Sequence, residues 1–191
     1  MNWLAHVWLS PNEPRQRLGN LLTDFLRPPE LVRLPAGYAP GVTLHRFIDT
    51  FTDAHPATQR TARCFWATHR RVSGILADVF FDHVLAAQWS DFEPRPLAEF
   101  NAAFYAEIEA HLDEIPASVH PALERLVAED WFGSYATLDG IGGILRRMEF
   151  RLRHRVDFCS ALAHYPPNAA AIGADFRELL RDLRAGIAPS P

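Results

Sequence analysis

The stretch TLHRFIDTFTDAHP, residues 43–56, decides the fold class, because its apolar residues recur with the period of a helix rather than the alternation of a strand. At 100° per residue, His45, Asp49 and Asp53 fall within roughly 80° of one another on the helical wheel. The stretch therefore predicts a helix whose apolar side packs against a core. Its other side carries an imidazole and two carboxylates.

The same period recurs along the chain between proline and glycine breaks, whereas strand alternation is scarce. Four prolines make residues 28–40 a predicted loop, and GIGG at 140–143 predicts a turn. We expect one all-α domain over 1–186, a multi-helix bundle, with 187–191 as a flexible tail. The expected helices span 2–10, 15–27, 41–53, 57–70, 72–90, 96–113, 119–131, 137–163 with a possible break, and 168–185.

Composition excludes several classes of protein. All 19 basic residues are arginine, so Schiff-base catalysis by lysine and a Walker A phosphate loop are both excluded. No apolar run reaches the roughly 20 uncharged residues of a membrane span, and no secretory signal is recognisable, so we expect a cytoplasmic protein without membrane insertion. Cys64 and Cys159 lack the paired spacing of a disulfide framework or a zinc knuckle.

Charge is unevenly distributed on this chain of net charge −4. Residues 91–130 hold ten acids and two arginines, whereas residues 146–155, RRMEFRLRHR, hold five arginines and one acid. The basic segment indicates either a local contact with an anionic partner or a solvated helix face. No interleaving of basic and aromatic residues indicates nucleic acid.

Several ionisable residues interrupt apolar helices in the N-terminal half. Asp78 and Asp82 share a stripe in GILADVFFDHVLAAQW, and His83 lies about 100° away on the wheel. His6 and Asp24 each stand alone within a short apolar segment. Burying such carboxylates is costly unless a cation compensates their charge.

Two interpretations of these residues follow. Imidazole with several carboxylates suits a divalent ion such as Mn²⁺, Mg²⁺ or Fe²⁺. Alternatively, the aspartates pair with arginines such as Arg46, Arg70 or Arg71, and the histidines are hydrogen-bonded core residues. For a single residue the structural interpretation is favoured, but so many ionisable groups are hard to satisfy pairwise, and together they favour a metal site.

The chain resembles the acyl carrier protein phosphodiesterases, also called ACP hydrolyases, in the segments MNWLAHVWLS, GNLLTDF, LHRFIDTFTDAHP, RRVSGILADVFFDHVLAAQW, DWFGSY and LRRM. The resemblance covers residues 1 to about 150. It implies an all-helical, HD-domain-like fold and a divalent cation, typically Mn²⁺. It also implies hydrolysis of the phosphodiester that joins 4′-phosphopantetheine to the serine of holo-acyl carrier protein. Phe47 stands where many members have a second arginine, and Thr23 where alanine is usual.

The resemblance marks His6, Asn20, Asp24, His45, Arg46, Asp49, Asp53, Asp78, Asp82 and His83. As metal ligands we expect His6, Asp24, His45, Asp78, Asp82 and His83. Asp49, Arg46 and Asp24 are the expected catalytic residues, with Asp49 positioning water or an imidazole and Arg46 offsetting phosphoryl charge. As contacts for substrate and carrier we expect Asn20, Asp53, Arg70, Arg71, Arg146 and Arg147.

Three alternatives stay open at this point. A small-molecule, nucleotide-type HD phosphohydrolase would share the metal site but need no basic docking surface. A non-catalytic module that binds the carrier would keep the basic surface and bind no metal. A purely structural helical protein would tolerate removal of the buried carboxylates. The sequence specifies no oligomeric state.

Overall fold

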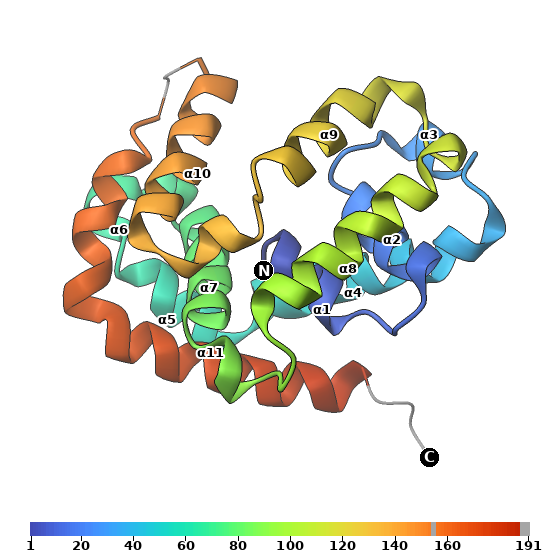
Figure 1. Ribbon diagram of the computed structural model, residues 1–191. Helices are drawn as coiled ribbons and strands as arrows, with labels where there is room; N and C mark the ends of the chain where they lie inside the picture. Colours follow the sequence, from blue (N-terminus) through green and yellow to red (C-terminus); the bar gives the residue numbers. More distant parts are fainter. Residues whose placement is uncertain (154–155, 188–191) are drawn as a thin grey trace.

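The computed structural model describes residues 1–153 and 156–187, in which helices joined by short turns account for all of the regular structure (Figure 1). This confirms the all-α class. Across these residues, no helix combines the length and apolarity that a bilayer crossing needs. The α-helices are α1 Trp3–Leu9, α2 Pro14–Leu22, α3 Pro28–Leu31, α4 Ala39–Ala54, α5 Pro56–Arg63, α6 Trp66–His69, α7 Ser73–Ala87, α8 Leu97–Ala110, α9 His120–Ala128, α10 Leu138–Arg151 and α11 Tyr165–Ile187.

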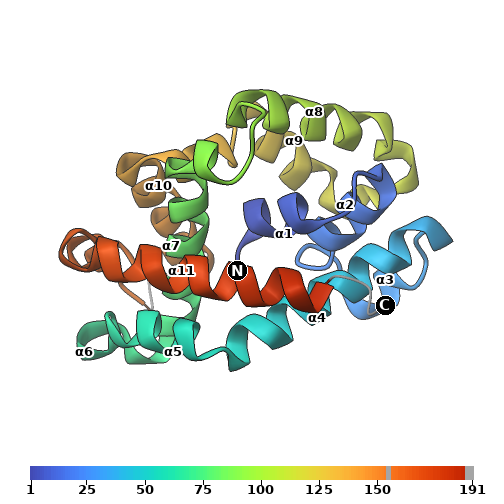
Figure 2. The same cartoon turned by 90° about the horizontal axis from the view of Figure 1, so that it is seen from below.

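Helix α7 forms the centre of the protein, because every side chain over residues 79–86 is buried. Helices α1, α5, α10 and α11 pack against it. Seen from below, α11 crosses in front of α7, while α8 and α9 lie on one side and α4 and α5 on the other (Figure 2). The N-terminus lies near the middle of the molecule in both views, so α1 begins inside the fold.

Helix boundaries differ from the sequence prediction where prolines were treated only as breaks. The expected loop over 28–40 contains α3 and the 3-10 turn Ala36–Tyr38. Two prolines open α3 and another two follow Tyr165 at the start of α11, since proline fits the first helical turn, whose N–H groups lack partners inside the helix. The helix expected over 15–27 ends at Leu22, and that over 57–70 is interrupted after Arg63.

The turn predicted at GIGG is wrong, because these residues lie inside α10. A Cβ on Gly140 would lie 1.9 Å from the carbonyl oxygen of Ser134. The glycine therefore allows α10 to start directly against the 3-10 turn Gly133–Ala136. The helix expected over 137–163 ends at Arg151 and is followed by the 3-10 helix Cys159–His164, while residues 154–155 lie outside the described part.

The buried apolar side chains form one cluster that runs from Met1 to Leu183. The last helix reaches Ile187, one residue beyond the expected domain end, and the rest of the expected tail, 188–191, lies outside the described residues. Single-domain organisation and the HD-domain-like topology stay predictions.

Candidate metal centre

The candidate metal centre forms where α1, α2 and α4 pack together. His6 lies in the middle of α1, Asn20 near the end of α2, and His45 and Asp49 one turn apart on α4. The two imidazole rings stack with their centroids 4.3 Å apart. Helices α1 and α4 therefore place two histidines that are distant in sequence side by side in the core.

Asn20 fixes both imidazoles. Its Oδ1 lies 2.8 Å from Nδ1 of His6 and 3.1 Å from Nδ1 of His45. Its Nδ2 donates to the carbonyl oxygen of His6 at 3.0 Å and to Oγ of Ser10 at 2.9 Å, which orients the amide with its oxygen toward the rings. An amide oxygen only accepts hydrogen bonds, so both Nδ1 atoms carry the proton. In the neutral rings, the lone pairs are therefore on Nε2.

Both Nε2 atoms face Asp49. They lie 3.1 Å (His6) and 3.0 Å (His45) from its two carboxylate oxygens. In this tautomer, the buried Nε2 of His6 has no hydrogen-bond partner among the described residues. Burial lowers the pKa of His6, which favours its neutral form. A lone pair of neutral His6 thus faces a carboxylate oxygen, and a cation between them would satisfy both.

The carboxylate of Asp49 is electrostatically prepared for this role. Burial alone would raise its pKa, but when the Nε2 atoms of His45 and His6 carry a proton, their hydrogen bonds and charge outweigh that effect and lower the pKa. A cation in the place of those protons would act in the same direction. Asp49 is consequently ionised at neutral pH. Its side chain is 45% exposed, whereas His6 and His45 are almost fully buried, so the centre has a buried nitrogen side and an open carboxylate side.

Asp24 adds a second carboxylate on the open side. It lies in the turn after α2, with Oδ1 at 3.5 Å from Nε2 of His45 and a side chain that is 43% exposed. Its Oδ2 accepts a hydrogen bond of 2.9 Å from Nε1 of Trp3. Among the described residues, the group able to offer a metal three ligand atoms is His6, His45 and Asp49, whose ligand atoms lie within 4.8 Å of one another, and Asp24 borders this group.

Asp78 and Asp82, expected as metal ligands, bind the start of the chain instead. Asp78 Oδ1 pairs with the α-amino group of Met1 at 2.8 Å. Asp82 is fully buried and accepts hydrogen bonds from the backbone N–H groups of Asn2, Leu4 and Ala5 at 3.0, 2.8 and 3.3 Å. These are the N–H groups that a helix start leaves without partners, so Asp82 caps α1 from the core.

His83 points away from the centre. Its Nδ1 lies 2.7 Å from the carbonyl oxygen of Tyr135, and its ring packs edge-on against Tyr165 at 4.8 Å. Burial lowers its pKa. The structure therefore brings together His6, Asp24, His45 and Asp49 but not Asp78, Asp82 and His83. Asp78 is held by the α-amino group of Met1, and Asp82 and His83 are held by backbone groups. Within the described residues, Arg46, Arg70 and Arg71 form no ion pair with the two aspartates.

The remaining expected residues lie around the centre or beyond it. Arg46 is exposed on α4, with no ion pair recorded across 1–153 and 156–187. The side chain of Asp53 is exposed overall, and its pKa is raised by partial desolvation of the carboxylate and by the charge of nearby Asp78. Arg70 and Arg71 are exposed at the 3-10 turn before α7. Arg146 is exposed on α10, and the guanidinium of Arg147 lies 4.9 Å from the ring of Trp131.

Asn20, expected to contact substrate, is instead fully buried, with its whole amide used inside the protein. Two contributors were missed by sequence reasoning. Ser10 holds the amide of Asn20, and Trp3 binds Asp24. Trp3 lies on the same segment as His6, which was the one signal that it could lie near the centre. A tryptophan in an apolar helix, however, is normally interpreted as a residue of the hydrophobic core.

Comparison with known proteins identifies the family. Residues 1–183 match the family described as acyl carrier protein phosphodiesterase. A protein of that name from Yersinia pestis is 36% identical over 152 residues, which is 79% of each chain. The protein of that name from Pectobacterium atrosepticum is 35% identical over 152 residues, which is 79% of each chain. The one from Salmonella dublin is 34% identical over 158 residues, which is 82% of this chain and 81% of the relative. No solved structure matches. The chain belongs to the acyl carrier protein phosphodiesterase family.

Proposed function

We propose that this protein is a metal-dependent phosphodiesterase that removes 4′-phosphopantetheine from the serine of holo-acyl carrier protein. Membership of the family and the printed names of its relatives support the reaction. The observation that carries the metal dependence is the pair of imidazoles whose Nδ1 atoms are both held by Asn20, so that both Nε2 atoms face the carboxylate of Asp49.

His6, His45, Asp49 and Asp24 are the residues we propose to hold the ion. The orphaned Nε2 of His6 is the feature that a cation fits best, since it is buried opposite an ionised carboxylate. Two imidazoles and two carboxylates without a thiolate suit Mn²⁺, with Mg²⁺ or Fe²⁺ as alternatives. When bound, such an ion lowers the pKa of a water molecule and offsets phosphoryl charge.

The protein's own groups prepare the reaction. Asn20 keeps both imidazoles in the tautomer with a free Nε2, and burial keeps His6 neutral. We propose that Asp49, ionised and half-exposed, also orients the attacking water beside the ion, and its exposure supports this role. Arg46 follows His45 directly on α4 and is exposed, so its guanidinium can meet the phosphoryl oxygens.

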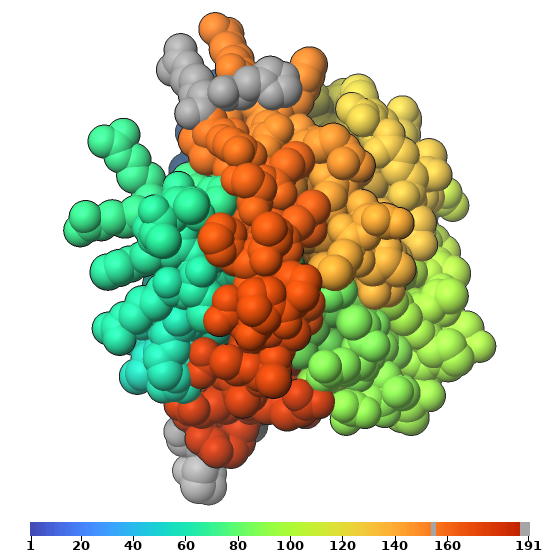
Figure 3. Space-filling model, turned by 90° about the vertical axis from the view of Figure 1, so that its left-hand side faces the viewer, coloured from blue at the N-terminus to red at the C-terminus, as the bar shows by residue number. Residues whose placement is uncertain are grey.

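Arginines of two surfaces are proposed as contacts for the acidic carrier. The first surface includes Arg70 and Arg71, and the guanidinium of Arg70 lies 5.5 Å from the exposed ring of Trp66. Side chains of this teal segment project from the surface in Figure 3. The second is the basic helix α10 with Arg146. Complementary charge would steer an acidic partner toward these surfaces. A cytoplasmic location is part of the proposal, and the two free cysteines fit a reducing compartment.

The reaction is tested by mass spectrometry of holo-carrier incubated with the protein, with and without Mn²⁺. We expect loss of the phosphopantetheine group only with the ion. Asp49→Asn should lose this activity, whereas Glu124→Gln, an exposed acid on α9, should keep it. Binding of the carrier without any hydrolysis would instead indicate the non-catalytic module.

Carrier docking is tested with the pair Arg70→Gln and Arg71→Gln. We expect a raised KM for the carrier, an unchanged kcat and a weaker dependence of kcat/KM on salt, because the pair supplies screened attraction. Arg27→Gln serves as the control, because it removes an arginine from another part of the surface, where its side chain is 86% exposed. Equal turnover of bis(p-nitrophenyl) phosphate and holo-carrier would favour the small-molecule phosphohydrolase.

A further inference from the structure

Asp24 has less support from the backbone than the other three residues of the metal centre. His6, His45 and Asp49 project from regular helices, whereas Asp24 follows the end of α2 in a turn. Its side chain is 43% exposed, so burial does not fix its rotamer. A carboxylate in this position needs a partner to keep one oxygen turned toward Nε2 of His45.

Trp3 supplies that partner. Its indole Nε1 donates to Oδ2 of Asp24 at 2.9 Å, while Oδ1 of the same carboxylate lies 3.5 Å from Nε2 of His45. The hydrogen bond thus takes the oxygen that faces away from the imidazole and leaves the other one turned toward the centre.

The indole of Trp3 is itself held by two aromatic neighbours. It packs against Phe25 with ring centroids 5.1 Å apart, and it stacks on Trp131 at 5.5 Å with an angle of 15° between the planes. Trp131 is fixed in turn, because its Nε1 donates to Glu129 at 2.8 Å and the guanidinium of Arg147 lies over its ring.

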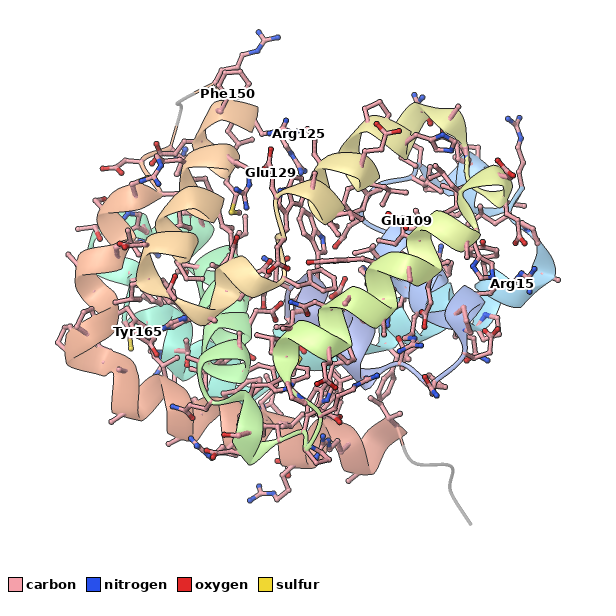
Figure 4. The ribbon with its side chains drawn as sticks, viewed as in Figure 1. Arg15, Glu109, Arg125, Glu129, Phe150 and Tyr165 are labelled. Atoms are coloured by element: carbon pink, nitrogen blue, oxygen red, sulfur yellow. The ribbon has the colours of Figure 1, made fainter. Side chains whose placement is uncertain are left out.

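This aromatic stack connects the metal centre with the gap between α9 and α10. Glu129 lies at the end of α9, beside Arg125, and both are labelled at this gap in Figure 4. Arg147 on α10 lies 3.9 Å from Glu129. Arg147 therefore has partners at the far end of the stack, and its expected role in substrate binding stays a prediction.

We propose that Trp3 is a positioning residue, which orients the carboxylate of Asp24 for the metal ion through its indole N–H. This inference rests on the proposed metal centre and assigns Trp3 no contact with substrate. Partners that orient a ligand commonly contribute about 10-fold to about 100-fold to metal affinity. The exposure of Asp24 places the expected effect at the lower end of that range.

The test is Mn²⁺ affinity, measured by electron paramagnetic resonance, in Trp3→Phe. This variant keeps an aromatic ring in contact with Phe25 and Trp131 but lacks the N–H donor. We expect Mn²⁺ to bind about 10-fold more weakly. The matched control is Trp8→Phe, which lies on the same helix and also loses an indole N–H bound to a carboxylate, that of Glu93. Its Mn²⁺ affinity should stay unchanged.

Asp24→Asn separates this inference from the metal centre beneath it. We expect Asp24→Asn to weaken Mn²⁺ binding, and Trp3→Phe to add nothing in the Asp24→Asn background, because the indole acts through that carboxylate. A Trp3→Phe protein that binds Mn²⁺ as the wild type does, while Asp24→Asn binds weakly, overturns the positioning role alone. If Asp24→Asn also binds normally, the place of Asp24 in the centre is refuted instead.

Discussion

Replacing Asn20 by alanine removes the group on which both imidazoles depend. The variant leaves the Nδ1–H groups of His6 and His45 buried without an acceptor, and both rings are at most about 5% exposed. A buried polar group left unsatisfied costs about 1–3 kcal/mol, so two of them predict a loss of about 2–6 kcal/mol in the free energy of unfolding. Metal affinity should fall by at least about 10-fold, because the tautomer and orientation of both rings are released.

Urea unfolding with EDTA measures the stability of Asn20→Ala, and electron paramagnetic resonance measures its Mn²⁺ affinity. Asn101→Ala is the control, since Asn101 is also buried but its amide makes a single hydrogen bond, of 3.3 Å to Asp130. Asn20→Asp keeps an acceptor for both rings and should bind Mn²⁺ more tightly than Asn20→Ala. A loss of less than about 1 kcal/mol in Asn20→Ala, with Mn²⁺ affinity equal to that of the wild type, would show that Asn20 does not hold the two imidazoles.

Three further predictions concern residues outside the centre. Burial raises the pKa of Asp82 to about 7, so the folded protein binds a proton that the unfolded chain releases near pH 4. The free energy of unfolding of the wild type should therefore decline as the pH rises from about 4 to about 7, by up to about 1.4 kcal/mol per pH unit. Urea unfolding midpoints, measured with EDTA, should show this decline in the wild type and not in Asp82→Asn. His83→Leu removes the hydrogen bond to the carbonyl of Tyr135, so the free energy of unfolding should fall by about 1–3 kcal/mol while Mn²⁺ affinity stays unchanged. An affinity about 10-fold weaker would indicate that His83 is a metal ligand after all. Gly140→Ala should destabilise the protein by about 1–3 kcal/mol or more in thermal unfolding, whereas Gly143→Ala, whose Cβ would meet only Arg147 at 3.8 Å, should not.

The helical period was sufficient to predict the all-α class and the proximity of His45, expected as a ligand, to Asp49, expected as a catalytic residue. His45 and Asp49 lie one turn apart on one helix, so the helical wheel brings them together without any knowledge of the fold. His6 and Asp24 were selected as ionisable groups in apolar segments, a signal that does not say which partner each will meet. Asp82 gives the same signal, and its partners prove to be the N–H groups at the start of α1.

The other differences arise from contacts between distant segments. Asn20 reads as an ordinary polar residue, because only the packing of α2 against α1 and α4 places two imidazoles at its oxygen. Trp3 reads as a core residue until its indole N–H is seen to meet Asp24. The glycines of GIGG read as a turn because the sequence does not show the backbone of Ser134 that approaches Gly140.

We propose that His6, His45 and Asp49 meet at a divalent cation. The most direct measurement is the anomalous scattering of a crystal grown or soaked with Mn²⁺. We predict an anomalous peak bonded to Nε2 of His6, Nε2 of His45 and the carboxylate of Asp49, with Asp24 on its open side. A peak at Asp78 or Asp82 instead, or no peak between the two imidazoles in a crystal saturated with Mn²⁺, would contradict the claim.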